Sequence, residues 1–260
     1  MSLPAGSSSS QPTSQARATR ATGSGQSIRR TARTTGALYL GFVVAGILGF
    51  VIIRPQLYAP GDPTATLDNL VDNEGLARVG VVLEMGIVVA QALTALWFYR
   101  LFRSVDAFAA GALAAFGMVN AVAILGSAAF LATAAQIAAE PLENAAANVQ
   151  LAYLVSENLW GVGALFFGLW LIPMGACVLR AQAMPRTLGW ILIGGGAGFL
   201  VNAFVTYLTP DLGAIAGVLV VPATIGEFWM IAYLLFRGIN QTAIVSGTVA
   251  DAAPEAAPTQ

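Results

Sequence analysis

The stretch GVVLEMGIVVAQALTALWF, residues 80–98, decides the class of this protein. A helix that rises ~1.5 Å per residue needs about 20 mostly apolar residues to cross the hydrocarbon core of a bilayer. This stretch has about that length, and Glu84 is its one ionisable side chain. It therefore predicts a transmembrane helix that carries a carboxyl group.

The composition of the whole chain agrees with a lipid environment. Apolar residues make up 57% of the 260 residues and charged residues 10%, whereas about a quarter of a soluble domain is charged. Charged residues at this frequency cannot cover the surface of a water-soluble fold. Lipid must therefore surround most of the chain. The net charge of −1 argues against nucleic acid as a partner.

Six apolar segments follow one another along the chain, and each is long enough for a transmembrane helix. They predict an all-α, polytopic bundle of six transmembrane helices. The segments lie at 34–53, 77–98, 107–133, 152–179, 187–208 and 214–236.

Arginine placement predicts the orientation of these helices, because cytoplasmic flanks are enriched in basic residues. Every second connection between the predicted helices is basic, as are the two terminal flanks, and the other connections are mostly acidic. Arg54 and Arg78 are exceptions in the first acidic connection, and both lie close to helix ends. Both termini are therefore predicted to be cytoplasmic. The basic flanks contain Arg17, Arg20, Arg29, Arg30, Arg33, Arg100, Arg103, Arg180, Arg186 and Arg237.

Two polar tails flank the predicted transmembrane domain, 34–237. Residues 1–33 are rich in Ser, Thr and Arg, and residues 238–260 are rich in Ala and Pro. Both compositions offer little to bury and predict disorder. An acid-free N-terminal segment is also typical of an organellar transit peptide, but the orientation favours a cytoplasmic tail.

Three carboxyl groups lie within or at the edge of the predicted spans: Glu84, Glu157 and Glu227. A charge at the bilayer centre costs at least ~2.5–3.5 kcal/mol, so such residues usually face protein or water. Small residues accompany each Glu at helical spacing, as Gly161, Gly168 and Gly175 do for Glu157. Because small residues let membrane helices approach closely, all three Glu side chains are predicted to face helix seams.

The depth of each Glu follows from its distance to the inner flank. Arg180 follows Glu157 by 23 residues, Arg100 follows Glu84 by 16, and Arg237 follows Glu227 by 10. Glu157 is then at the outer interface, and Glu84 and Glu227 are intramembrane. The candidate polar sites inside the membrane are Glu84, Gln91, Asn120, Asn202 and Glu227.

These sites leave three interpretations open. The Glu side chains hydrogen-bond across helices as structural groups, or they form a path for protons or a cation, or they line a pocket for a lipid or small apolar molecule. Two further features support the path for protons or a cation. Pro173 and Pro222 are expected to interrupt two helices, and the GGGAG run at 194–198 is expected to form a tight helix crossing.

The first outer loop is predicted to hold a short surface helix. Asp62 followed by Pro63 is a helix-start signature, an N-cap before Pro at the first helical position. Asp62, Asn69 and Arg78, together with Glu157, form the predicted polar outer interface. Arg78 is expected to pair with Asp72, Glu74 or a lipid phosphate, because six residues set it about 120° from Glu84 on one helix.

The absence of His and the single Cys177 exclude His-ligated haem, His-containing zinc sites and nucleophile–His pairs. Phosphate-binding and dinucleotide-binding glycine motifs are also missing. No metal, cofactor or catalytic residue is predicted.

Several short blocks, in order and spacing, resemble a bacterial membrane family catalogued as domain of unknown function 4386. The resemblance implies a multi-pass protein of the bacterial plasma membrane, with no established activity. Where that family often has His after Phe-Phe-Gly-Leu, this chain has Trp170. The blocks are Thr35-Gly36-Ala37-Leu38-Tyr39-Leu40, Gly61-Asp62, Thr66, Asn69, Leu76, Arg78, Gly80, Tyr99-Arg100-Leu101-Phe102, Phe166-Phe167-Gly168-Leu169, Pro185-Arg186-Thr187-Leu188-Gly189 and Gly226-Glu227.

The leading functional hypothesis is a non-enzymatic integral membrane protein that acts as a small carrier or permeation pathway, with Glu84 and Glu227 as its polar centres. The alternative is a structural or sensory membrane protein that acts through a partner. An intramembrane enzyme ranks last, because it would need a carboxylate pair at one depth. The expected partners are the lipid bilayer and an unidentified small molecule or protein.

Overall fold

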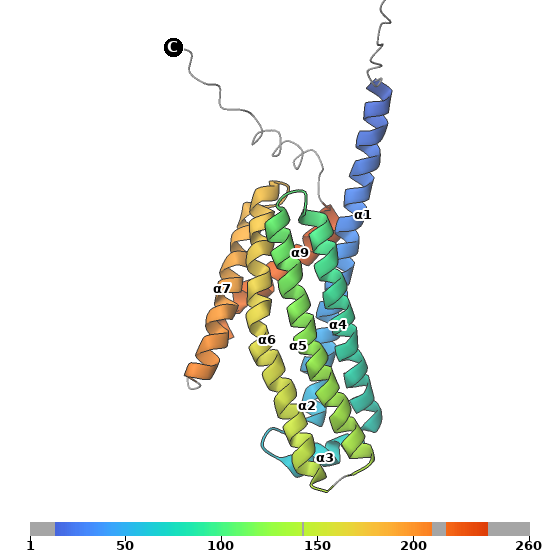
Figure 1. Cartoon of the computed structure of the whole chain (residues 1–260), viewed down its shortest axis with the longest axis vertical. Helices are drawn as coiled ribbons and strands as arrows, with labels where there is room; N and C mark the ends of the chain where they lie inside the picture. The colour runs from blue at the N-terminus through green and yellow to red at the C-terminus, as the bar shows by residue number, and fades with distance from the viewer. Residues whose placement is uncertain (1–13, 142, 210–216, 239–260) are drawn as a thin grey trace, which may run out of the picture.

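The computed structural model describes residues 14–141, 143–209 and 217–238, with side chains from Ser27 on. Throughout these ranges the regular structure is helical, and no strand occurs in them. Figure 1 shows long helices side by side, with one short helix across their lower ends. The predicted all-α membrane fold is confirmed.

Within the described ranges, five helical segments are long and apolar enough to cross a membrane: Ser27–Leu57, Glu74–Phe102, Ala107–Ala139, Ala145–Ala181 and Arg186–Leu208. The first consists of α1 (Ser14–Gly46), the π-helical turn η1 (Ile47–Ile53) and α2 (Arg54–Leu57). The others are α4 (Glu74–Phe102), α5 (Ala107–Ala139), α6 (Ala145–Ala181) and α7 (Arg186–Leu208). The first five predicted spans coincide with these helices.

The sixth predicted span, 214–236, is only partly described. Its described part is α9 (Val221–Ala232) followed by η3 (Tyr233–Arg237), and residues 210–216 lie outside the described residues. The count of six spans and the cytoplasmic position of both termini therefore stay predictions.

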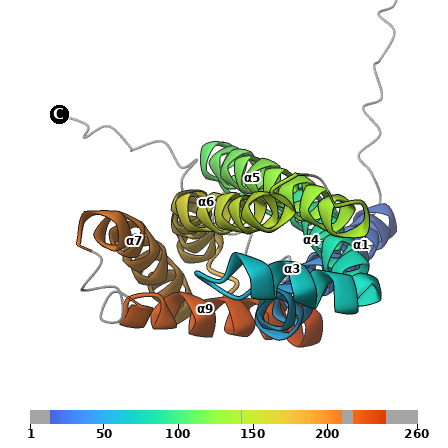
Figure 2. The same cartoon turned by 90° about the horizontal axis from the view of Figure 1, so that it is seen from below.

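The long helices form a closed ring of neighbours. Moving around it, α1 packs on α4, α4 on α5, α5 on α6, α6 on α7 and α7 on α9, and η3 packs back against α1. Figure 2 shows α9 passing across the side of the molecule between α7 and α1. Residues far apart in the sequence, at the two ends of the described chain, thus face one shared interior.

The two ends of the bundle differ in charge. The α4–α5 and α6–α7 connections lie at the same end as the start of α1 (Figure 1). These connections and the helix ends beside them carry Arg100, Arg103, Arg180 and Arg186. The short helix α3 (Pro63–Asp72) and the α5–α6 connection lie at the opposite end. The Arg-rich flanks therefore share one end, which the positive-inside rule predicts to be the cytoplasmic end.

The outer helix α3 begins where the sequence predicts. The side chain of Asp62 accepts a hydrogen bond of 2.9 Å from the backbone N–H of Ala65, and Pro63 occupies the first helical position. α3 contacts α4, α5 and α6, so it closes the outer end of the bundle.

The N-terminal segment and Pro173 differ from their predictions. α1 begins at Ser14, so residues 14–33 continue the first membrane helix, as expected where an existing helix need only propagate. Pro173 lies inside an uninterrupted α6. The sixth segment is interrupted as predicted, because residues 219–220 form a turn and Pro222 follows in the first turn of α9, where its missing N–H leaves no bond unmade. Residues 1–13 and 239–260 lie outside the described residues.

Glycines bring α6 and α7 into close contact. A Cβ atom added at Gly168 would lie 2.7 Å from the carbonyl oxygen of Gly196, and one at Gly175 would lie 2.5 Å from that of Gly189. On the next face of α7, a Cβ at Gly195 would lie 2.5 Å from the backbone of Ala223 in α9. The predicted tight crossing at 194–198 is confirmed, since only hydrogen fits at these points.

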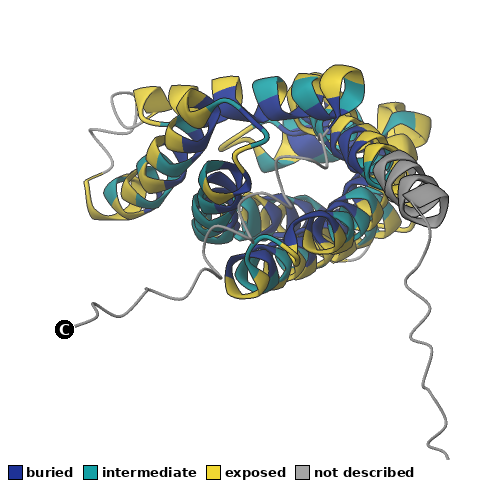
Figure 3. Cartoon of the chain, turned by 90° about the horizontal axis from the view of Figure 1, so that it is seen from above, coloured by how far each residue is buried: buried dark blue, intermediate teal, exposed yellow. Residues whose placement is uncertain are grey.

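Buried residues face the ring interior, and exposed ones face outward (Figure 3). Many exposed side chains are apolar, including Val82, Val122 and Phe204, as a lipid-facing surface requires. Inside, one apolar cluster surrounds Tyr39 and Trp170, and a second surrounds Leu57, Tyr58 and Tyr153 beneath α3. The interior therefore has an inner and an outer core.

Replacing Gly168 with Ala tests the α6–α7 contact. We expect Gly168→Ala to lower the unfolding free energy by about 1–3 kcal/mol, because the added methyl overpacks the crossing. Gly194→Ala is the control, since a Cβ there has no neighbour within 4 Å and Ala favours helix by up to ~1 kcal/mol. Thermal unfolding of the detergent-solubilised protein measures both, and equal stability of the two variants would contradict the packing.

Candidate functional site

Glu227 is held at the inner core by a residue from the opposite end of the chain. Its carboxyl group on α9 is buried and accepts a short hydrogen bond from the hydroxyl of Tyr39 on α1. The Tyr39 ring has no exposed surface and packs edge-on against Phe98 and Trp170, at centroid distances of 5.7 and 5.4 Å. Aromatic packing thus fixes the donor that the described residues provide to this carboxyl group.

Glu84 occupies a second, separate polar site. It is buried on α4, and its Oε1 accepts a hydrogen bond of 3.2 Å from the indole N–H of Trp160 on α6. Its Oε2 has no hydrogen-bond partner among the described residues. Glu84 also borders a small cavity of about 10 Å³, which is lined in part by Gly80, Leu131 and Tyr153.

Arg54 lines the same cavity as Glu84 and is itself buried. Its guanidinium donates to the hydroxyl of Ser156 and to the carbonyl oxygen of Tyr153, each at 3.1 Å. The group also lies over the rings of Phe50, Tyr58 and Tyr153, at 5.1, 5.7 and 5.6 Å. A buried cation is thereby stabilised by aromatic faces and neutral acceptors, close to a carboxyl group that it does not directly pair with.

The Arg54 site continues through two serines. The hydroxyl of Ser156 on α6 lies 2.7 Å from that of Ser127 on α5, and both residues are fully buried. The outer polar site therefore joins α2, α5 and α6 through Arg54, Ser127 and Ser156, with Glu84 of α4 beside the shared cavity.

Gln91 and Asn120 lie between the two carboxyl sites. Gln91 follows Glu84 by two helical turns on α4, and both of its side-chain polar atoms are buried without a partner among the described residues. Asn120 on α5 is also buried, and its side-chain nitrogen has no partner in the described part of the chain. α4 and α5 are antiparallel, and Gly117 of α5 faces Ala95 of α4. Gln91 lies one turn outward from Ala95, and Asn120 lies one turn outward from Gly117, so the two side chains are at about the same depth.

The indole N–H of Trp170 is another buried donor without a partner among the described residues. Its ring touches both Tyr39 and the position of Gly117. Unmade hydrogen bonds of buried polar groups each cost about 1–3 kcal/mol. From outside to inside, the bundle therefore contains Glu84, then Gln91 and Asn120, then Trp170 with the Tyr39–Glu227 pair.

The remaining predicted residues lie away from this interior line. Asn202 on α7 is half-buried, and its carbonyl oxygen accepts a bond from the hydroxyl of Thr206. At the outer end, Asn69 is half-buried in α3, and Arg78 forms an exposed ion pair with Glu74, one of its expected partners.

The prediction that Glu157 faces a helix seam is wrong, because its side chain is exposed. Gly161, Gly168 and Gly175 do face α7, through Tyr207, Gly196 and Gly189. However, α7 ends at Leu208 and reaches the next turn of α6 only through Tyr207, whose hydroxyl donates to Asn158 and not to Glu157. Glu157 therefore sits just beyond the end of the seam.

Sequence reasoning missed Tyr39 and Arg54 as parts of these sites. Arg54 was assigned to a helix end, although Phe50 and Tyr58 flank it at spacings of four residues and so share its helix face. That aromatic–Arg–aromatic spacing is a usable signal. Tyr39 has no comparable signal, because its partner Glu227 is 188 residues away.

These features define a polytopic helical membrane protein with buried polar sites inside its bundle. Within the described part of the chain, no group of three His, Cys, Asp or Glu side chains could hold a metal ion.

The family model described as Domain of unknown function (DUF4386) matches residues 34–238, which run from the first membrane helix to the end of η3. The chain belongs to this family, as its sequence blocks indicate. No curated protein and no solved structure matches the chain.

Removing the Tyr39 hydroxyl tests the inner site. We expect Tyr39→Phe to lower the unfolding free energy by about 1–3 kcal/mol, because it leaves the buried Glu227 carboxyl without its donor. Tyr99→Phe, at an exposed ring, is the control. In a double-mutant cycle, Tyr39→Phe should cost less in a Glu227→Leu background, and strict additivity would contradict a direct bond.

The outer site is tested by Arg54→Lys. A lysine ammonium keeps the charge but lacks the planar fork that bonds two acceptors while stacking on rings. We expect a loss of about 1–3 kcal/mol in unfolding free energy, compared with no measurable change for Arg103→Lys at an exposed position. Unchanged stability of Arg54→Lys would show that charge alone is required.

Proposed function

We propose that this chain is a small carrier or permeation pathway of the bacterial plasma membrane that moves protons through its helix bundle. Glu84 and Glu227 are the groups that take up and release the proton. The observation that carries this proposal is the interior line of buried polar side chains between the two carboxyl groups. Several of these side chains have polar atoms that bond to none of the described residues.

The size of the space beside Glu84 favours a proton over an organic solute. A cavity of about 10 Å³ matches the roughly 10–15 Å³ that one water molecule needs. A solute would require a much larger opening. A water molecule in this cavity could deliver a proton to Glu84 or accept one from it.

The buried charge of Arg54 favours a proton over a metal cation. The guanidinium lines the same cavity as Glu84, so any other cation that enters meets a fixed positive charge at close range. A proton that binds Glu84 instead becomes part of a neutral carboxyl group. Arg54 is then a filter at the outer end of the path.

The two carboxyl groups suit different steps because their surroundings differ. Glu84 accepts from Trp160 and keeps its other oxygen without a partner among the described residues, whereas Glu227 accepts from Tyr39. Glu84 is therefore the group that exchanges with the outer side, and Glu227, ten residues before Arg237, exchanges with the inner side. Their separate neighbours also argue against a carboxylate pair for acid–base catalysis, and so against an enzyme.

The test is proton flux into proteoliposomes that contain the purified chain. A potassium gradient with valinomycin sets the membrane potential, and an internal pH-sensitive dye reports proton entry. We expect Glu84→Gln and Glu227→Gln each to reduce flux at least tenfold, since an amide cannot carry the proton. Glu157→Gln, at an exposed carboxyl group, is the matched control and should retain the flux of the unchanged protein.

Flux that both Gln variants retain would contradict the proposal. The carboxyl groups would then be structural, and the alternative of a structural or sensory membrane protein that acts through a partner would replace the carrier. The same conclusion would follow if the unchanged protein gave no flux above that of empty vesicles.

A further inference from the structure

A large polar groove lies at the Arg-rich end of the bundle, between α1 and α4. Its volume is about 880 Å³, which lies within the range of about 300–1,000 Å³ typical of ligand sites. The groove is separate from the interior line of Glu84, Gln91 and Glu227. Its lining consists of Ser27, Arg29, Arg30, Thr31, Arg33, Thr34, Trp97 and Arg100.

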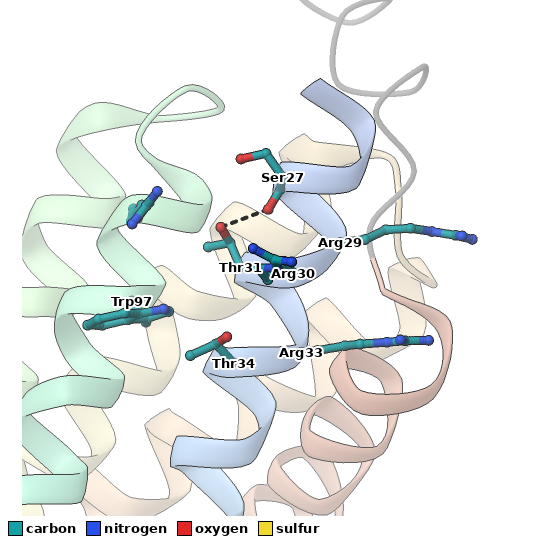
Figure 4. A pocket seen from close by; sticks show the side chains of 8 residues that line it. Ser27, Arg29, Arg30, Thr31, Arg33, Thr34 and Trp97 are labelled. Carbon is teal, nitrogen blue, oxygen red and sulfur yellow. Dashed lines mark hydrogen bonds between the residues drawn. The ribbon is translucent and has the colours of Figure 1, made fainter. Parts of the chain in front are cut away.

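The charge of this groove is of one sign. Four arginines line it, and no lining residue is acidic. The ion pairs of the described side chains use Arg78 with Glu74 and Arg180 with Asp106. The four guanidinium groups thus have no carboxylate partner among the described residues. Arg29 and Arg33 extend to the far side of α1 (Figure 4), so they add positive potential at this end, and Arg30 and Arg100 are the arginines left to contact a ligand between the helices.

Neutral donors complement the arginines. Figure 4 shows Thr31 and Thr34 on the side of α1 toward Trp97, while Arg29 and Arg33 extend to the other side. The Thr31 hydroxyl is used in a bond to the carbonyl oxygen of Ser27. The Thr34 hydroxyl has no such bond among those described and faces the groove. Guanidinium forks and hydroxyl groups are the usual donors to phosphate oxygens.

The depth of the groove favours an anion that belongs to a lipid. Trp97 marks the headgroup level, where indole rings of membrane proteins concentrate. Further along the same two helices, toward the middle of the membrane, Leu40 of α1 and Leu96 of α4 expose apolar side chains. A phosphate bound by the arginines would therefore have an apolar surface beside it along which acyl chains can lie.

We propose that this groove binds the phosphate headgroup of an anionic phospholipid from the inner leaflet, with Arg30 and Arg100 bonding the phosphate from the two helices. The bound lipid bridges α1 and α4 at the cytoplasmic end. This proposal does not depend on proton movement through the interior.

Binding is measured on the full chain in neutral detergent, by calorimetric titration with short-chain phosphatidylglycerol. Short-chain phosphatidylcholine and inorganic phosphate are the two comparison ligands. We expect phosphatidylglycerol to bind more tightly than either, because only it combines an uncompensated negative charge with acyl chains.

The variant Arg30→Gln/Arg100→Gln should weaken phosphatidylglycerol binding by about 30-fold, given roughly 1 kcal/mol per Arg at a membrane surface. Arg103→Gln/Arg186→Gln removes the same charge from exposed positions at the same end, outside the groove, and should bind as the unchanged protein does. Arg30→Lys/Arg100→Lys keeps the charge and should bind with intermediate strength, because it lacks the forks.

Three results would overturn the proposal. Equal weakening by the two Gln double variants would mean that charge attracts lipid to this end without a site. Inorganic phosphate that binds as tightly as phosphatidylglycerol would make the ligand a soluble phosphate. Equal affinity for phosphatidylcholine would remove the role of negative charge.

Discussion

Lipid hydrocarbon cannot hydrogen-bond, so every polar group inside this bundle depends on partners within the protein. The three most costly groups are Glu84, Glu227 and Arg54. Each of these groups bonds to a helix other than its own. Glu227 accepts from Tyr39 of α1, and Glu84 accepts from Trp160 of α6. Arg54 of α2 donates to Ser156 of α6. Apolar packing alone gives a helix in lipid little preference for one neighbouring helix over another. These hydrogen bonds therefore determine which helices pack together.

Small residues make those bonds geometrically possible. The contacts of Gly168 with Gly196 and of Gly195 with Ala223 let α6, α7 and α9 approach until their backbones touch. That approach brings α9 across to α1, where Glu227 meets Tyr39. The glycine contacts and the polar contacts therefore depend on each other, although they involve different faces of the helices.

Much of the fold could be predicted from the sequence, since apolar length, helical spacing and cap residues are local properties. The first five spans, the Asp62 cap and the small-residue face of α6 all follow from such local rules. The exposure of Glu157 could not be predicted, because it depends on where the neighbouring helix α7 ends. The continuation of α1 back to Ser14 was missed because the polar composition of that segment indicates disorder when read alone.

The polar site was predictable only in part. Helical spacing placed Glu84 and Gln91 on one inward face, and both are buried. The partners of the carboxyl groups were not predictable, because they depend on the order and rotation of the helices in the ring. Residues 188 positions apart, as Tyr39 and Glu227 are, can be paired only when the arrangement of α1 and α9 is known.

The central claim is that the interior polar line exchanges protons with water. Infrared spectroscopy of the carboxylic acid C=O stretch tests it most directly, with Glu84→Gln and Glu227→Gln used to assign the two bands in lipid. The account predicts that both bands shift when the membranes are transferred to D₂O, because each carboxyl proton is replaced. Bands that stay unshifted over hours would mean that the interior is sealed, and would contradict a proton path.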